Sequence, residues 1–314
     1  MKGLDLARAF YEECGLKMLE EQFPDILDKI AIGLLGSGSE CYGYDDEISQ
    51  DHDFEPGFCI FLPDEAVVSE KQAFQLERAY NKLPKEFRGY KRNLLNPVGG
   101  NRHGVFRASE YFLEKTGSAD GSLTLQQWFT TPDYVLSEAT NGEIFRDDSK
   151  LVTSIRKNLL DMPQDVFLKK LAGNVLVMSQ SGQYNYNRCL KRQETAAAQL
   201  AINEFVRATM KVVFLLNRTY MPYYKWSFRA MRELPKLSVI AEILEYLLTS
   251  GNDEGEVVTK TGMIENVVSL ITEELMAQDL SDEQGEELER HAYSINDRIE
   301  QNDIRNMDVF SAVM

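Results

Sequence analysis

Residues 34–62, LLGSGSECYGYDDEISQDHDFEPGFCIFL, say more about this chain than any other segment. They predict the end of one strand, a turn from Gly36 to Ser39, a spacer, and a second strand that carries Asp51 and Asp53. Side chains two residues apart on a strand point to the same face, so both carboxylates should aim at one spot, as a divalent-metal site requires. The turn offers backbone N–H groups without bulky side chains, which suits a phosphate. A phosphate cradle beside a hard-cation site indicates phosphoryl or nucleotidyl transfer.

The spacing within this segment resembles the signature of the polymerase-β-like nucleotidyltransferase superfamily. There, a strand that ends in Gly-Ser is followed by a spacer and by Asp-x-Asp inside a strand, and both Ser37 and Ser39 stand at a fitting spacing from Asp51. GSGSE and SQDHDFEPG together resemble a bacterial branch of that superfamily, which has Asp-His-Asp at this point. His52 replaces the usual apolar residue, and we expect it to be structural. The plainer interpretation is an ordinary turn and an Asp pair that caps a loop.

A second stretch, NRTYMPYYKW at residues 217–226, resembles a run in the helical domain of the same branch. The overall plan is similar to that of kanamycin-type nucleotidyltransferases, in which a small catalytic domain faces a helical bundle. The resemblance implies a Mg²⁺-dependent enzyme that moves a nucleoside monophosphate from ATP or another nucleoside triphosphate to a hydroxyl or amine of a small molecule. Asp51 and Asp53 would hold the metal. The residues implied to grip the phosphates are Gly36, Ser37, Gly38 and Ser39.

Basic residues in the second half form the other candidate group. Lys225, Arg229 and Arg232 are spaced so that a helix places them on one face. By the same resemblance, Lys225 would act as a phosphate clamp, supported by Arg188 or Arg229. The alternative is a set of surface bases on solvated helices.

The superfamily usually has a third carboxylate, and the sequence does not point to one residue. Glu194, at the start of a long helical pattern beside the basic segment, is preferred as the catalytic base, and Glu110 is the alternative. Asp147 and Asp148 fit a helix N-cap or a loop better. Without a third acid, the protein would be a degenerate member that binds nucleotide without turnover.

Element patterns predict an α+β protein. Apolar runs predict strands at Lys29–Leu35, Phe54–Leu62 and Val105–Ser109, with helices between them, so that a small mixed-sheet domain should span residues 1–150. From there on the pattern is helical and predicts an all-helical bundle over residues 151–314. The run SGNDEGEV at residues 250–257 is interpreted as a flexible loop.

The net charge of −16 is unevenly distributed. Residues 251–314 hold 16 acids and four bases, whereas residues 186–236 hold 10 bases and three acids. A strongly acidic protein is a poor partner for extended nucleic acid, which needs a broad basic surface. The local basic segment suits a nucleoside triphosphate instead.

Cysteines and apolar runs indicate a cytoplasmic protein. The four cysteines are scattered and have no Cys-x-x-Cys spacing, which favours reduced thiols, and the three histidines are too dispersed for zinc. No run is long enough to span a membrane, and the N-terminus has no secretory signal. The aromatic residues of the bundle fit a homodimer surface as well as a core.

Other functions remain open from the residues alone. The acceptor of the nucleotide could be a macromolecule, either a tRNA end or a protein side chain as in toxin-like relatives, although the −16 charge argues against tRNA. The non-enzymatic alternative is a nucleotide sensor or interaction module whose acidic helical end binds a partner.

Overall fold

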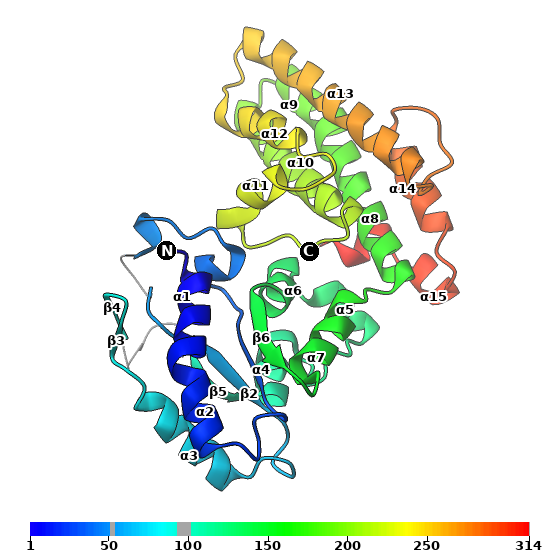
Figure 1. The fold of residues 1–314 in the computed structure, drawn as a ribbon. Helices are drawn as coiled ribbons and strands as arrows, with labels where there is room; N and C mark the ends of the chain where they lie inside the picture. The colour runs from blue at the N-terminus through cyan, green and yellow to red at the C-terminus, as the bar shows by residue number, and fades with distance from the viewer. Residues whose placement is uncertain (51–53, 93–101, 314) are drawn as a thin grey trace. The chain divides into compact units, whose positions relative to one another are not determined.

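The computed structural model describes residues 1–50, 54–92 and 102–313 and has an α+β fold (Figure 1). The chain divides into two compact units. One comprises residues 1–124 and 135–161 and holds the sheet, and the other comprises residues 125–134 and 162–314 and is helical. The expected boundary at residue 150 therefore lies inside the first unit, and a short segment before it packs with the second.

The first unit has a four-stranded mixed sheet with the order β5-β2-β1-β6. The strand β1 (Ala31–Leu34) pairs antiparallel with both β2 (Cys59–Leu62) and β6 (Glu143–Asp147), whereas β5 (Gly104–Arg107) pairs parallel with β2. A separate hairpin joins β3 (Glu86–Phe87) and β4 (Tyr90–Lys91). Gly33 lies opposite Cys59, so the end of β1 lies beside the beginning of β2.

Helices cover both faces of this sheet (Figure 1). Ile60 and Leu62 of β2 pack with the N-terminal helices and α3, whereas Phe61 points to the other face and meets Tyr111 and Phe112 of α4. This is the period-two alternation of a strand that is buried on both sides. The helical segments of the unit are α1 (Gly3–Phe10), a π-helical turn η1 (Tyr11–Gly15), α2 (Leu16–Gln22), the 3₁₀ turns η2 (Ser39–Tyr42) and η3 (Ile48–Gln50), α3 (Glu70–Asn81), α4 (Ala108–Thr116), α6 (Asp133–Thr140) and α7 (Leu151–Leu160).

The helical unit is built around α8 (Gln164–Met178), which is buried along nearly its whole length. It packs mainly against α10 (Thr195–Leu216) and α14 (Leu288–Asp297). The apolar stripe predicted for α10 is confirmed, since Ala198, Ile202 and Phe205 are fully buried. The remaining elements are α5 (Leu125–Thr130), the π-helical η4 (Ser179–Tyr186), α9 (Asn187–Lys191), α11 (Tyr224–Arg232), α12 (Ile240–Thr249), α13 (Glu254–Ala277), α15 (Asn302–Arg305) and the 3₁₀ turn η5 (Val309–Ala312).

Several predicted boundaries are wrong. The second strand begins at Cys59 rather than Phe54, because the Glu55-Pro56-Gly57 turn precedes it. The loop predicted at residues 250–257 ends early, since Asp253 accepts a hydrogen bond from Glu256 N and caps α13 from Glu254 onward. The sequence also gave no prediction of β6 or α4.

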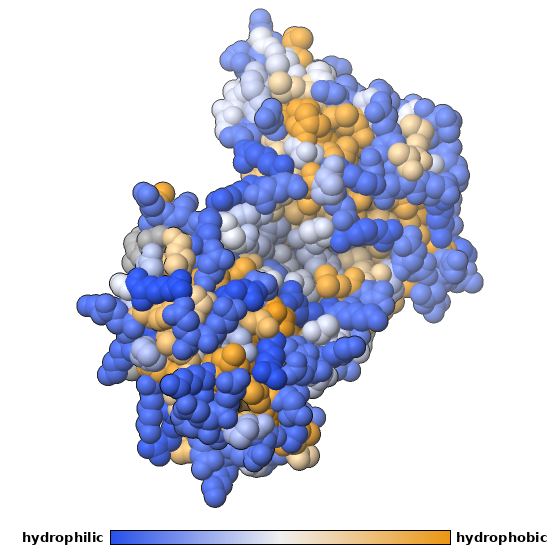
Figure 2. Space-filling view, viewed as in Figure 1, coloured by the Kyte–Doolittle hydropathy of each residue, from blue (hydrophilic) through white to orange (hydrophobic). Residues whose placement is uncertain are grey.

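Most of the visible surface is hydrophilic, with hydrophobic residues exposed in scattered places (Figure 2). Among the described residues, no helix is long and apolar enough to cross a membrane.

Candidate functional site

The Gly/Ser turn directly follows β1 and is held by hydrogen bonds to Asn141. Gly36 adopts a φ of 132°, which disfavours any residue with a side chain. Gly36 N donates to Asn141 Oδ1 at 2.9 Å, and Asn141 Nδ2 donates back to Gly36 O at 2.7 Å. One amide side chain therefore satisfies both backbone groups of the residue where the chain leaves the sheet. The position of the turn is set by this pair.

The rest of the turn presents hydrogen-bonding groups that no described residue engages. Ser37 is exposed and Ser39 is half-buried. Within residues 1–50, 54–92 and 102–313, neither the backbone N–H nor the hydroxyl of Ser37 or Ser39 donates to a protein acceptor. A fixed turn with unused donors is the local geometry that a phosphate group requires.

The helix α6 covers the turn from one side. Ser137 contacts the hydroxyl of Tyr42 at 3.2 Å, and Asn141 follows one turn later. The hydroxyl of Tyr111 lies 3.5 Å from the carbonyl oxygen of Leu35. Burial raises the pKa of Tyr42 to about 12 and raises that of Tyr111 further, so both hydroxyls stay protonated as donors.

Two further carboxylates, those of Glu40 and Glu138, were not predicted from the sequence as part of the site. The carboxylate of Glu40 lies directly against Gly38, where a Cβ would collide with it, and it accepts no hydrogen bond from a described residue. Glu138 on α6 is half-buried, and burial raises its pKa, although Lys115 at 3.6 Å opposes that rise. Glu40 follows the GSGS run and could have been noticed there. Glu138 had no signal, because only the tertiary structure brings α6 to the turn.

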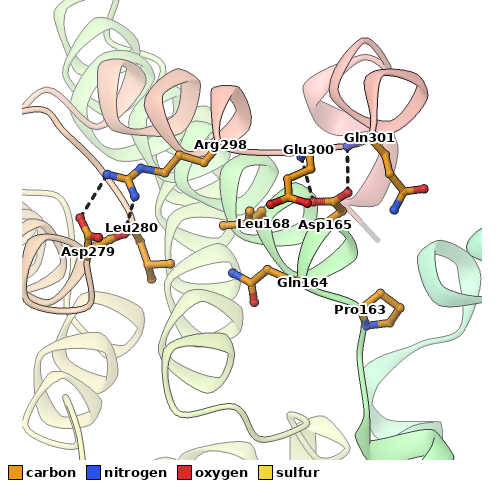
Figure 3. Close-up of a pocket in the computed structure, with 9 residues that line it drawn as sticks. All are labelled: Pro163, Gln164, Asp165, Leu168, Asp279, Leu280, Arg298, Glu300 and Gln301. Carbon is orange, nitrogen blue, oxygen red and sulfur yellow. Dashed lines mark hydrogen bonds and ion pairs between the residues drawn. The ribbon is translucent and has the colours of Figure 1, made fainter.

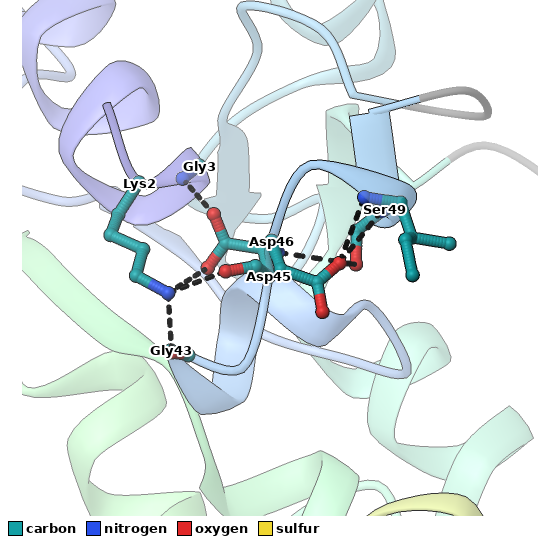
Figure 4. Close-up of polar contacts among 7 residues, drawn as sticks. Lys2, Gly3, Gly43, Asp45, Asp46 and Ser49 are labelled. Carbon is teal, nitrogen blue, oxygen red and sulfur yellow. Dashed lines mark hydrogen bonds and ion pairs between the residues drawn. The ribbon is translucent and has the colours of Figure 1, made fainter.

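The N-terminus fixes the chain that leads away from the turn (Figure 4). Gly3 N donates to Asp45 Oδ2 at 2.8 Å, and the Lys2 ammonium binds the carbonyl oxygens of Gly43 and Asp45. Asp45 is only 2% exposed, and its Oδ1 accepts no hydrogen bond. The next residue, Asp46, caps the short η3 turn through Ile48 N and Ser49 N, both at 3.0 Å.

Asp51, His52 and Asp53 lie outside the described residues. Their described neighbour Phe54 lies close to the turn, because a Cβ on Gly3 would be 2.6 Å from Glu40 Cβ and 3.2 Å from the Phe54 ring. Among the residues that the structure describes, no three His, Cys, Asp or Glu side chains gather as a metal site. The predicted magnesium ligands Asp51 and Asp53 thus fall outside the part of the chain that the structure describes.

The phosphate-binding and catalytic residues predicted in the second half of the chain flank α10, some before its start and some after its end. Arg188 stacks on Tyr184 with 4.5 Å between the guanidinium and the ring centroid, and Glu194 stands exposed at the start of α10. Lys225 and Arg229 follow the other end of that 22-residue helix. Lys225 is exposed over the ring of Trp226 at 4.9 Å. Lys225 and Arg229 share a helix as predicted, whereas Arg188 lies on a separate one.

The other acidic residues considered in the sequence either stabilise a helix or follow a strand end that lies away from the Gly/Ser turn. Asp147 is the last residue of β6, and its carboxylate accepts from Leu151 N at 2.7 Å and Thr153 N at 2.8 Å. It therefore stabilises the first turn of α7 as the N-cap interpretation expects, although the N-cap residue itself is Lys150. Glu110 is exposed in the first turn of α4. It comes shortly after Arg107, the last residue of β5, which the parallel register places beside Leu62. That end of the sheet lies away from the Gly/Ser turn, because the turn follows the end of β1 that lies beside Cys59.

The helical unit contains two polar cavities. The larger, of about 410 Å³, is shown in Figure 3. Two of its charged side chains are already engaged: Asp165 accepts from the backbone N–H groups of Glu300 at 3.1 Å and Gln301 at 3.0 Å, and Arg298 binds Asp279. The smaller, of about 20 Å³, holds a Lys170–Asp133 ion pair at 2.9 Å and has room for a water molecule.

Comparisons with known proteins give one finding. A family model described as a domain of unknown function (DUF4037) matches residues 128–227, about a third of the chain. No curated protein and no solved structure matches. The matched segment runs from α5 to α11 and includes Arg188, Glu194 and Lys225, but it does not include the Gly/Ser turn.

Proposed function

We propose that this protein is a nucleotidyltransferase that binds the triphosphate of a nucleotide at the Gly36–Ser39 turn and transfers a nucleoside monophosphate to a small-molecule hydroxyl or amine. The observation that carries the proposal is the set of unused serine donors on a turn that Asn141 holds in place at the end of a buried strand. The resemblance of the surrounding sequence to the polymerase-β-like superfamily agrees with it.

In this proposal Ser37 and Ser39 bind and orient phosphate oxygens through their N–H and hydroxyl groups. Asp51 and Asp53 would hold Mg²⁺, which when bound neutralises charge on the triphosphate as pyrophosphate leaves. Glu40 fits as a further oxygen ligand, because its carboxylate is free and lies against the same turn. Positioning and electrostatics provide most of the rate enhancement in such chemistry.

Glu138 is a candidate for the group that accepts the proton of the acceptor hydroxyl. Burial raises its pKa, which is the direction that favours a general base, although the ion pair with Lys115 at 3.6 Å opposes the rise. The attack would form an acceptor O–P bond, break the bond to pyrophosphate and pass one proton to the carboxylate. This assignment replaces Glu194 and Glu110 as our preferred third acid.

The test is thermal shift with ATP, GTP, CTP and UTP, each with and without Mg²⁺. A ligand that binds only the native state stabilises it by about 2.7 kcal/mol at a hundredfold excess over its dissociation constant, so binding is easily seen. We expect a Mg²⁺-dependent shift with at least one nucleotide. Ser37→Ala should reduce it, and Asp51→Asn with Asp53→Asn should abolish its Mg²⁺ dependence.

Matched controls are available on the same unit. Asp28 and Ser154 are exposed, and Asp28→Asn and Ser154→Ala should leave the shift unchanged. A shift without pyrophosphate release in the presence of candidate acceptors would instead favour a nucleotide sensor. If no nucleotide shifts the wild type, the proposal is wrong.

A further inference from the structure

A second candidate binding surface lies at the edge of the sheet in the first unit. It is a groove of about 670 Å³ lined by residues of α3, α4 and β5 together with Leu62 at the end of β2. Because α3 packs on one face of the sheet and α4 on the other, a groove lined by both runs along the outer edge of β5. We call it the β5 groove.

The strand that forms its floor has an unpaired edge. β5 is the first strand in the order β5-β2-β1-β6, and no other described strand pairs with its outer side. All four residues of β5 are only half-buried, whereas β1 and β2 are fully buried. An exposed strand edge is a template for one more strand, because its free N–H and C=O groups can pair with an extended peptide.

The walls of the β5 groove carry an excess of negative charge. Its two bases are already engaged: Arg107 binds Glu70 at 2.6 Å, and Lys115 binds Glu138 at 3.6 Å. The remaining carboxylates have no ion pair within the described part of the chain and are exposed; they are Glu77, Glu110 and Glu114. Glu77 lies on α3, and the other two lie one turn apart on α4.

The groove also offers an apolar contact. Phe74 of α3 is 60% exposed, although it is a large hydrophobic residue, and it lines the groove beside Ala73 and Val105. Most exposed hydrophobic residues need no explanation, but this one lies where a free strand edge and unpaired acids meet.

We propose that the β5 groove binds an extended basic segment of a partner protein as an added strand. The backbone of the segment would pair with the outer edge of β5. Side chains alternate along a strand, so basic residues would reach the glutamates while an apolar residue packs on Phe74. Four residues of β5 span about 13 Å, which sets the bound length at four to six residues.

The β5 end of this surface lies away from the Gly/Ser turn, whereas its α4 wall reaches toward the turn. Since β1 and β2 are antiparallel, the turn lies near Cys59, and Leu62 and Arg107 lie at the opposite end of the sheet. Tyr111 and Lys115 also line the groove, and they contact Leu35 O beside the turn and the Glu138 carboxylate, respectively. Peptide binding and nucleotide binding are measured by separate assays, and strand pairing on β5 does not require that a nucleotide binds, so the two proposals can fail independently.

The experiment measures fluorescence anisotropy of a labelled, acetylated Lys-Val-Lys-Val-Lys-Val peptide with the full chain. The expected result is saturable binding that weakens with salt and protects the amides of Val105 and Arg107 from hydrogen exchange, since Gly104 N donates to Phe58 O and alternate amides point away from β2. Glu110→Lys with Glu114→Lys should raise the dissociation constant by about tenfold or more, since two attractions become repulsions. The matched control, Glu20→Lys with Glu21→Lys on the exposed face of α2, makes the same charge change and should have little effect.

Three outcomes would overturn the proposal. Equal weakening by the α2 variant would mean non-specific attraction to an acidic protein. Undiminished binding of a peptide with alternate backbone nitrogens methylated would exclude strand pairing. Displacement of the peptide by spermine at its own binding concentration, with no amide protection, would make the β5 groove a small-polycation site.

Discussion

Two glycines with left-handed backbones show how single residues hold the turn. Gly142 has a φ of 64°, and a Cβ there would collide with the carbonyl oxygen of Leu34 in β1. Gly43 has a φ of 69°, yet nothing lies within 4 Å of the place where its Cβ would be. Both positions favour glycine for backbone conformation, but only Gly142 also allows the close approach of two chain segments.

Gly142→Ala should therefore destabilise the protein much more than Gly43→Ala. Each change adds about 1–2 kcal/mol of left-handed strain, and only the first adds a clash with backbone. Urea denaturation of both variants measures the difference directly. Equal losses would mean that the chain near Leu34 moves aside without cost.

The buried thiols give a prediction for alkaline pH. Burial raises the pKa of Cys59 to about 12 and raises that of Cys41 well above its usual value. Unfolded thiols ionise near pH 8.5, so the folded state holds more protons above that pH. The free energy of unfolding should be independent of these groups below about pH 8 and should fall by about 1.4 kcal/mol per pH unit and thiol above it.

Urea denaturation between pH 7 and pH 9.5 tests this expectation, at values about 1.5 units below and 1 unit above the unfolded thiol pKa. Cys59→Ala should reduce the slope, because one thiol that burial keeps protonated is then missing from the folded state. A slope that survives replacement of both Cys41 and Cys59 would assign the effect to other groups.

At the scale of elements, a buried acid joins α8 to the loop between α14 and α15. Asp165 is 7% exposed and accepts two backbone hydrogen bonds, from Glu300 N and Gln301 N (Figure 3). These bonds lower the pKa of Asp165, although burial opposes them as the largest single influence. The carboxylate thus connects the first turn of one helix to a segment far along the chain.

Asp165→Asn should lower the free energy of unfolding by about 2 kcal/mol at pH 7, because the amide keeps only one acceptor oxygen. A lowered folded-state pKa stabilises above the unfolded value of about 3.9, and the contribution is lost as pH falls through the folded value. The gap between wild type and variant should therefore close in acid. Asp161→Asn, at an exposed carboxylate, is the control, and a gap that does not narrow as the pH falls below about 3.9 would contradict the assignment.

Elements with regular patterns were predictable, and those fixed by distant contacts were not. The strand β1 and the helix α10 are apolar runs of sufficient length, and both formed where expected. The short β6 has only a half-buried pattern, and the Asn141-Gly142 turn before it is its one local signal. The second strand begins five residues later than expected, and Asp51 and Asp53 lie outside the described residues, so their predicted common face stays a prediction.

At the scale of the whole molecule, the excess of acidic residues predicts a repulsion that salt can screen. The net charge is −16, and residues 251–314 contribute most of it. Such an excess destabilises a compact state by self-repulsion, and salt screens it over about 10 Å at 0.1 M. Stability should thus rise when salt is added.

Raising NaCl from about 0.01 M to about 0.15 M should raise the urea midpoint, since the Debye length shortens from about 30 Å to about 8 Å. Glu265→Lys with Glu273→Lys on α13 lowers the magnitude of the net charge and should reduce this response. Replacing the same two residues by Asp keeps the charge and serves as control. A midpoint that falls with salt would mean that ion pairs outweigh the repulsion.

The sequence alone determined the α+β class, the buried strand before the Gly/Ser turn, and the helical second half, because these depend on local periodicity and composition. The tertiary structure decided what surrounds the turn: Asn141 about a hundred residues later, Glu138 on α6, and the N-terminal Gly3 beside Glu40. It also decided that β5 is an edge strand with unpaired acids beside it. No local pattern encodes such neighbours, since they arise from packing between segments that are distant in the chain.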